Sequence, residues 1–312
     1  MPNPDKIGPI GIFLRGLAMG AADVVPGVSG GTIAFITGIY ARLLAAIASF
    51  NLELLRVFRK GGVVAAWRHV DGAFLVSLLA GIICALVLFA RLLTSALDEY
   101  PLIVWSFFFG LVAASVYHMA RQIPSFTINR IILFLIGATF AYAISIAKPV
   151  SAPTAHWFIF VAASISICAT ILPGISGSFI LLLVGVYPVV LEAIGYGDYE
   201  VIAYFASGAI FGLLTFVKVV SWMFAKYEVE TLSVLTGFLL GSLNTLWPWK
   251  VVTQSTIKPD GSVVALAQDR VLPVTWEAAT GSESMWIVCL AAMGIGVLLV
   301  LVLELFGKEK NI

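Results

Sequence analysis

The stretch Asp23-Val24-Val25-Pro26-Gly27-Val28-Ser29-Gly30-Gly31-Thr32 decides the fold, because a related stretch returns as Thr170-Ile171-Leu172-Pro173-Gly174-Ile175-Ser176-Gly177-Ser178. Each copy lies inside an apolar run and is followed by a Gly-x-Tyr triplet, Gly38-Ile39-Tyr40 and Gly185-Val186-Tyr187. Proline removes a backbone donor and glycine weakens a helix, so both runs should break here. At membrane depth a broken helix is tolerated only where protein buries it or a wet cavity meets it. Two breaks in matching positions of two halves indicate the binding site of a transporter.

The composition excludes a soluble domain. Hydrophobic residues make up 61% of the chain and charged residues 11%, and the mean hydropathy is +1.04. Several runs reach the roughly 20 apolar residues that a membrane-spanning helix needs. Cys84, Cys168 and Cys289 are far apart and have no metal or redox spacing. The sequence contains no nucleophile elbow, phosphate-binding loop or metalloprotease motif, so we expect no enzyme, no metal and no cofactor.

The order of apolar runs predicts an all-α polytopic membrane protein. We expect a broken hairpin over residues 7–50, with arms Ile7 to Val25 and Thr32 to Phe50, and spans within 72–147. A second hairpin over 157–194 and spans within 201–306 follow, with a polar external loop at 248–284. We expect each hairpin to be re-entrant, with its tip inside the membrane; the alternative is a pair of short complete spans, which would give the same sidedness. Because the basic segment Asn51 to His69 should face the cytoplasm, both termini are predicted to be cytoplasmic.

The two halves can be aligned by their motifs. Pro26 and Pro173 lie 147 positions apart, whereas Gly81 and Gly208 lie 127 apart, as do Gly110 and Gly237. The basic connector, which the second half lacks, absorbs the difference. Each repeat is thus one broken hairpin plus three spans, residues 1–147 and 148–312, and the odd number of spans inverts the second copy. Inverted repeats of this kind commonly support alternating access around a site at mid-membrane.

The breaks themselves are candidate anion sites. Each precedes a fresh apolar helix, so Ser29 and Ser176 are predicted N-caps. The first amides of a helix are unpaired and carry a partial positive charge, which suits a phosphate or carboxylate. The predicted substrate-binding residues of the two breaks are Ser29, Gly30, Gly31, Thr32, Ser176, Gly177 and Ser178. The alternative is a pair of Pro-Gly kinks that let helices pack closely, with their serines bonded internally.

Four charged residues near the breaks are further candidates. Asp23 has no acidic counterpart, because Thr170 aligns with it. A carboxylate at membrane depth costs about 2.5–3.5 kcal/mol, so it should relay protons, hold a cation, orient Arg15 or cap the broken backbone. Arg91 and Lys218 lie 127 positions apart and thus occupy the same place in the two repeats. They could contact a lipid phosphate, or simply extend to the membrane interface.

These motifs carry a resemblance that spans nearly the whole chain. Gly20 to Thr32, Leu172 to Ser178, and Gly241-Ser242-Leu243 ahead of Trp247-Pro248-Trp249 resemble the bacterial polyprenyl-phosphate transporters of the PopT type, formerly a membrane domain of unknown function. The resemblance implies flipping of undecaprenyl phosphate, the carrier lipid of peptidoglycan and other envelope polymers, from the outer to the inner leaflet for reuse. It implies a multi-pass protein of the bacterial cytoplasmic membrane.

Taken with the anion sites, this suggests a path for the phosphate. It would be received from outside near Ser176, Gly177, Ser178 and Arg91, and would then pass to Ser29, Gly30, Gly31, Thr32 and Lys218 as the halves rock. Coupling to a proton or sodium ion through Asp23 is a hypothesis. The expected partners are the polyprenyl phosphate and membrane lipids, with no nucleic acid; a homo-oligomer is left open. Two other classes stay open: a gradient-driven transporter of a small soluble anion, and a non-transport partner of envelope synthesis enzymes.

Overall fold

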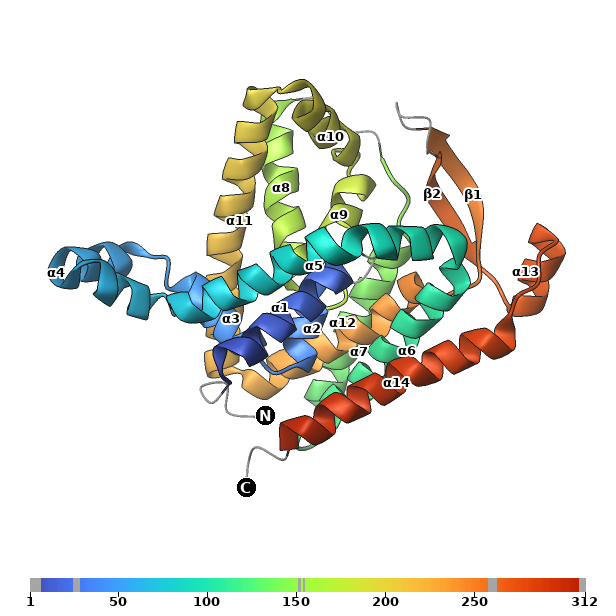
Figure 1. Ribbon diagram of the computed structural model, residues 1–312, viewed down its shortest axis with the longest axis horizontal. Helices are drawn as coiled ribbons and strands as arrows, with labels where there is room; N and C mark the ends of the chain where they lie inside the picture. Colours follow the sequence, from blue (N-terminus) through green and yellow to red (C-terminus); the bar gives the residue numbers. More distant parts are fainter. Residues whose placement is uncertain (1–6, 25–28, 151–152, 154, 258–262, 309–312) are drawn as a thin grey trace.

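A computed structural model describes residues 7–24, 29–150, 153, 155–257 and 263–308 of the chain. Helices dominate it, and one two-stranded hairpin stands beside them (Figure 1). The elements are, in order, α1 (Pro9–Val24), α2 (Gly30–Ile36), α3 (Tyr40–Ala48), α4 (Leu52–His69), α5 (Gly72–Glu99), α6 (Pro101–Ala120), α7 (Ile128–Ile146), α8 (His156–Ile171), α9 (Gly177–Leu183), α10 (Tyr187–Tyr196), α11 (Tyr199–Lys226), α12 (Glu228–Leu246), β1 (Lys250–Ile257), β2 (Val263–Arg270), α13 (Pro273–Thr280) and α14 (Trp286–Lys308).

Long apolar helices make this a multi-pass membrane protein. Within the described residues, five helices are long and apolar enough to cross a bilayer, and the number rises to seven if each bent helix pair counts as one span. Large apolar side chains on their outward faces, such as Val87 on α5 and Ile136 on α7, are exposed. In water such a surface would be costly, whereas lipid tails are a suitable solvent for it.

The apolar runs break where the sequence predicts. In the first half α1 ends at Val24 and α2 begins at Gly30; residues 25–28, with Pro26 and Gly27, lie outside the described residues. In the second half α8 ends at Ile171 and α9 begins at Gly177. Between these two helices Gly174 has φ +87°, a backbone conformation that glycine adopts without strain.

The outgoing arm of each hairpin is not the single helix expected for Thr32 to Phe50 and Ile180 to Ile194. It bends a second time, by 116° between α2 and α3 and by 103° between α9 and α10. Gly38 and Gly185, the glycines of the two Gly-x-Tyr triplets, stand at these bends with φ of 74° and 72°. A residue with a side chain is strained in that conformation, so the glycine permits the turn.

Small residues set the closest helix contacts of the two hairpins. Helix α1 packs along α5, and α8 packs along α11. A side chain added at Gly81 would collide with the carbonyl oxygen of Phe13, and one added at Gly208 with that of Phe160. Backbones approach this closely in membranes because packing and not water exclusion drives helix association there.

The remaining spans pair across the two halves of the chain. Helix α6 packs along α14, and α7 packs along α12. Gly110 faces the carbonyl oxygen of Met293, and Gly237 faces that of Phe134. The last helix of each half is therefore bound to the middle helix of the other half.

The polar segment 248–284 folds into a cap with structure of its own, so the chain is not helical throughout. Strands β1 and β2 form an antiparallel hairpin, and α13 lies beside it (Figure 1). Trp247 donates its ring N–H to the carbonyl oxygen of Val271 at 2.8 Å, and Trp249 donates to that of Ser284 at 3.0 Å. These bonds attach the cap to the end of α12.

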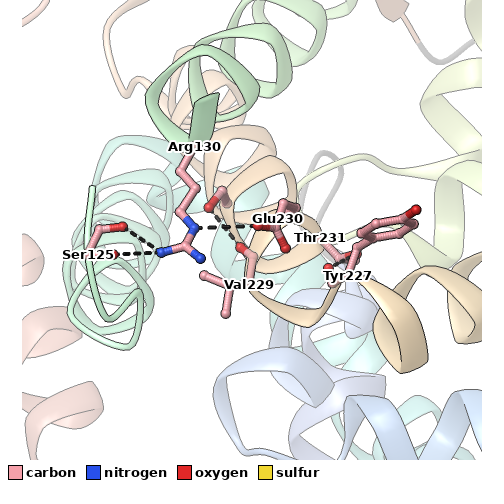
Figure 2. A network of polar contacts seen from close by, with 7 residues as sticks. Ser125, Arg130, Tyr227, Val229, Glu230 and Thr231 are labelled. Carbon is pink, nitrogen blue, oxygen red and sulfur yellow. Dashed lines mark hydrogen bonds and ion pairs between the residues drawn. The ribbon is translucent and has the colours of Figure 1, made fainter. Parts of the chain in front are cut away.

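At the other end of α12 a small polar network joins it to α7 (Figure 2). Arg130 donates to the carbonyl and hydroxyl oxygens of Ser125 at 3.0 and 2.7 Å, and its Nε lies 3.5 Å from a carboxylate oxygen of Glu230. Thr231 donates its hydroxyl to the carbonyl oxygen of Tyr227 at 2.7 Å, which closes the first turn of α12. Arg130 lies in the first turn of α7 and Glu230 in the first turn of α12, so the network joins the starts of the two helices.

The basic connector forms helix α4, which projects from the bundle (Figure 1). Asn51 caps it by accepting the amide hydrogens of Glu53 and Leu54. Gly62, with φ +67°, interrupts it midway. At its far end Arg42 of α3 pairs with Asp71 at 2.6 Å, which ties the first hairpin to the start of α5.

Candidate functional site

The two breaks meet in the interior of the molecule, although more than 140 residues separate them along the chain. The Ser29 hydroxyl donates to the carbonyl oxygen of Thr170 at 2.9 Å. In return, the backbone N–H of Gly174 donates to the Thr32 hydroxyl oxygen at 2.9 Å. Ser29 and Thr32 are each only 1% exposed. Side chains of the first break thus satisfy backbone groups that the second break leaves unpaired, as burial requires.

Gly31 is the point of closest approach between the two breaks. A Cβ added to it would collide with the backbone carbonyl oxygen of Ile171. Gly31 is therefore needed because only a residue without a side chain lets the two backbones come this close, in addition to any effect it has on the helix.

The amides at the start of α2 are already engaged in this conformation. Asp23 accepts the Gly30 amide hydrogen at 2.6 Å, and Ser29 accepts that of Gly31 at 3.1 Å. Ser29 is therefore the N-cap of α2, as predicted. Asp23 caps the broken backbone, which is one of the roles that the sequence suggested for it. The partial positive charge at the N-terminus of α2 also stabilises this carboxylate.

The second break differs because Thr170 replaces the aspartate. Its hydroxyl lies against Gly177 and donates to the carbonyl oxygen of Ser166 at 3.0 Å. Ser176 occupies the N-cap position, but its side chain caps no backbone amide. Its hydroxyl oxygen instead lies 2.9 Å from that of Ser178, whose side chain is exposed. Ser176 is therefore the N-cap residue as predicted, but its hydroxyl is paired with that of Ser178 and not with a backbone amide.

A small cavity of about 10 Å³ adjoins this second break. Its lining comes from the break, the first turn of α9, α7 and α12: Gly174, Ile175, Ser176, Phe179, Ala141, Ile144, Ser145 and Thr245. The volume is room for about one water molecule, far below the roughly 300–1,000 Å³ typical of small-molecule pockets. In this conformation the cavity therefore marks where hydroxyl groups of the break, α7 and α12 come together, and a ligand would have to widen it.

A cation that the sequence did not single out reaches this cavity wall. Arg270, at the end of β2, donates to the carbonyl oxygen of Ser145 at 2.9 Å and to that of Asn244 at 3.2 Å. Asn244 in turn donates to the Ser145 hydroxyl at 2.6 Å. Arg270 lies in the polar segment, far from either motif in sequence, so no pattern linked it to the breaks. Ser145 and Thr245 were missed for the same reason.

Three predicted cations lie elsewhere. Arg15 donates to the carbonyl oxygens of Thr37 and Gly11, at 3.3 and 2.9 Å, and so supports the second bend and not Asp23. Arg91 and Lys218 are exposed on α5 and α11. Among the described contacts neither one touches a break residue, so their role stays a prediction.

Comparison with known proteins places the chain in a family. Residues 19–264 match the family described as "VCA0040-like: Undecaprenyl phosphate translocase-like", and this range includes both breaks. The chain belongs to the undecaprenyl phosphate translocase-like family. The family resemblance inferred from the break motifs is confirmed.

Two relatives of this translocase-like chain carry the same name. A "Polyprenyl-phosphate transporter" of Vibrio cholerae serotype O1 is 43% identical over 297 residues, which cover 95% of this chain and 96% of the relative. A "Polyprenyl-phosphate transporter" of Staphylococcus aureus is 26% identical over 254 residues, 76% of this chain and 85% of the relative. No solved structure gives a significant match.

Proposed function

We propose that this protein flips undecaprenyl phosphate, or a related polyprenyl phosphate, from the outer to the inner leaflet of the bacterial cytoplasmic membrane. The carrier lipid would then be available again for envelope synthesis. The observation that carries the proposal is the joint between the two breaks, where Ser29 and Thr32 bond Thr170 and Gly174. A phosphate inside the membrane needs polar groups, and the joint brings hydroxyl groups and backbone amides of the two breaks together in the interior of the molecule. The names of both relatives agree with the substrate.

The packing of the halves supports an inverted repeat. Phe13 and Phe160 lie 147 positions apart, as the break motifs do. The carbonyl oxygen of each lies against a glycine of its own half, Gly81 for Phe13 and Gly208 for Phe160. Those glycines lie 127 positions apart, the offset found from sequence. Equivalent residues therefore make equivalent contacts in the two hairpins, which is the expectation for a duplicated unit.

The crossed pairing of spans supports the same reading. Gly110 contacts Met293 of the other half, while Gly237 contacts Phe134 of the other half. A two-fold axis that exchanges the halves would turn the first contact into the second. Two halves related in this way can exchange inward and outward arrangements at little cost in free energy, which alternating access requires.

The difference between the breaks supports a conformation that receives its substrate from one side. The first break is buried, and Asp23 and Ser29 hold its amides. The second presents Ser176 and Ser178 beside a cavity. With both termini cytoplasmic, this cavity would face the outer leaflet. In the opposite conformation Asp23 would release the Gly30 amide to the phosphate, so that its protonation or sodium binding could couple transport to a gradient.

The test is a flipping assay in proteoliposomes with a labelled polyprenyl phosphate, run with and without a proton or sodium gradient. We expect the protein to accelerate movement of the lipid between leaflets, and Ser176→Leu with Ser178→Leu to abolish it, because bulk there would cover both hydroxyls. Ser207→Leu, at an exposed position on α11, is the matched control. Unaccelerated flipping by the folded protein would refute the proposal.

Two parallel assays separate the other function classes. Uptake of inorganic phosphate into the same vesicles, without lipid movement, would favour a transporter of a small soluble anion. Absence of any transport, with intact binding to envelope synthesis enzymes, would favour a non-transport partner.

A further inference from the structure

Two cations lie side by side in the cap, at the ends of the two hairpin strands that adjoin the membrane helices. Lys250 begins β1 and Arg270 ends β2, and they are direct partners in the antiparallel register. Side chains of directly opposed residues emerge on the same face of the hairpin with their Cβ atoms about 5 Å apart. Two positive groups are thereby held together at the junction of the cap with α12.

Lys250 is recessed against an aromatic wall. Its ammonium nitrogen lies 3.4 Å from the ring centroid of Trp105 on α6, and Trp276 of α13 donates to its backbone carbonyl. Burial lowers the pKa of Lys250 to about 7, and the repulsion from Arg270 adds to the effect. A buried ammonium next to another cation is unfavourable unless something compensates it.

Among the described residues neither cation forms an ion pair with a carboxylate. Arg270 donates to three backbone carbonyl oxygens, those of Ser145, Asn244 and Gln268. Burial lowers the pKa of Arg270, and the nearby Tyr142 and Asp269 raise it again, so the Asp269 carboxylate offsets part of the positive charge. One carboxylate against two cations leaves an excess of positive charge at this place, which suits an anion.

The same pair is connected to the second break. Arg270 bonds Ser145, and Ser145 lines the cavity that Ser176 also lines. Ser145 thus links the site of the two cations to the cavity beside the hydroxyl groups of the second break. The neighbouring helix α7 exposes apolar side chains, among them Phe140 and Ile146, against which a lipid tail could lie.

We propose that Lys250 and Arg270 form the receiving site for the phosphate monoester headgroup of the lipid, before it moves to Ser176 and Ser178. The inference rests on the proposed function and adds its entry step. A phosphate beside Lys250 favours its protonated form, so the bound state has an ammonium point charge next to the anion. The guanidinium of Arg270 holds the cavity wall, and its charge also attracts the phosphate. The aromatic wall lowers the local dielectric constant and so strengthens the attraction.

Binding of a fluorescent short-chain polyprenyl phosphate to the protein in nanodiscs tests this step. Lys250→Met keeps the packing on Trp105 but removes the charge, and should weaken binding by about ten- to a hundredfold. Arg270→Gln should weaken it as well. Lys148→Gln removes an exposed cation at the same predicted face and should leave binding unchanged.

Folding is followed by thermal unfolding of each variant. Lys250→Met should unfold at the same temperature as the parent or a higher one, because it removes an uncompensated buried charge. Weaker binding in a variant of undiminished stability separates recognition from a structural role. Polyprenol, which lacks the phosphate, should not compete, and inorganic phosphate should compete weakly because it has no tail.

Several outcomes would overturn the assignment. Equal affinity of the parent and Lys250→Met, with lipid flipping intact, would remove the entry site and leave the proposed function standing. Binding of inorganic phosphate alone would show that the cations do not serve a lipid. A parent protein that neither binds nor flips the lipid would refute the proposed function itself.

Discussion

Asp23 accepts the Gly30 amide hydrogen at 2.6 Å, and Thr170 stands in its place in the second hairpin. One position thus carries a charged cap in one repeat and a neutral hydroxyl in the other. The carboxylate can be released by protonation, whereas the threonine cannot change its charge. Any coupling to an ion is for this reason expected in the first half alone.

Replacement of Asp23 separates its two roles. Asp23→Asn keeps an acceptor for the Gly30 amide, so the free energy of unfolding should stay within about 1 kcal/mol of the parent, while Asp23→Ala should cost about 1–2 kcal/mol. If the carboxylate couples transport, Asp23→Asn should flip lipid at a rate that no longer depends on the gradient. Thermal unfolding and the flipping assay measure these effects.

Asp98→Asn, at an exposed position before α6, serves as the control for Asp23. A gradient response that survives in Asp23→Asn would limit Asp23 to its capping role.

At the scale of elements, helix pairs depend on glycines that face a neighbouring backbone. Gly81 and Gly208 occupy equivalent places on α5 and α11, each against a phenylalanine carbonyl of its hairpin. These contacts fix how near each hairpin lies to its supporting span. The hairpins can therefore hold their breaks together at the centre.

Addition of one methyl group at these positions should loosen the packing. Gly81→Ala and Gly208→Ala are each expected to lower the free energy of unfolding by about 1–3 kcal/mol, because a rigid backbone cannot yield to the added carbon. Gly294→Ala on α14 meets nothing within 4 Å and should be neutral or mildly stabilising, since alanine favours the helix. Thermal unfolding in one detergent compares them. Equal loss at Gly294 would show that the close contacts are unimportant.

At the scale of the whole molecule, the two breaks differ in exposure. Ser29 is 1% exposed, whereas Ser176, at the matching position 147 residues later, is half-buried and has the exposed Ser178 beside it. If the two halves are repeats, as we propose, this difference is expected when the molecule adopts one of two opposite conformations. Access to the two breaks should thus alternate.

Cysteine labelling can detect this alternation. In a protein whose native cysteines Cys84, Cys168 and Cys289 are replaced by alanine, Ser178→Cys should react rapidly with a membrane-impermeant maleimide added outside. Thr32→Cys should be protected from that reagent and should become reactive from the inner side during transport. Protection of Ser178→Cys, or equal reactivity of both positions from outside, would contradict the outward-facing assignment.

The sequence alone determined the positions of the breaks and the class of protein. Pro173 and the paired Ser-Gly motifs interrupt a helix through local chemistry, and apolar length identifies membrane spans without knowledge of their partners. The offsets of 147 and 127 positions recur in the contacts of Phe13 with Gly81 and of Phe160 with Gly208, as expected if the two halves are repeats. The second bends at Gly38 and Gly185 were not expected, because a lone glycine in an apolar run is compatible with a continuing helix.

The tertiary structure decided which residues meet. Three contacts depend on how separate segments of the chain cross. Ser29 bonds Thr170, Asp23 accepts the Gly30 amide hydrogen, and Arg270 bonds Ser145 in the wall of the cavity that Ser176 also lines. Periodicity and composition report the environment along one segment, whereas a contact between segments is fixed by packing across the whole bundle. For this reason a polar segment that was expected only as an external loop contributes Arg270, which bonds Ser145 in the cavity wall beside the second break.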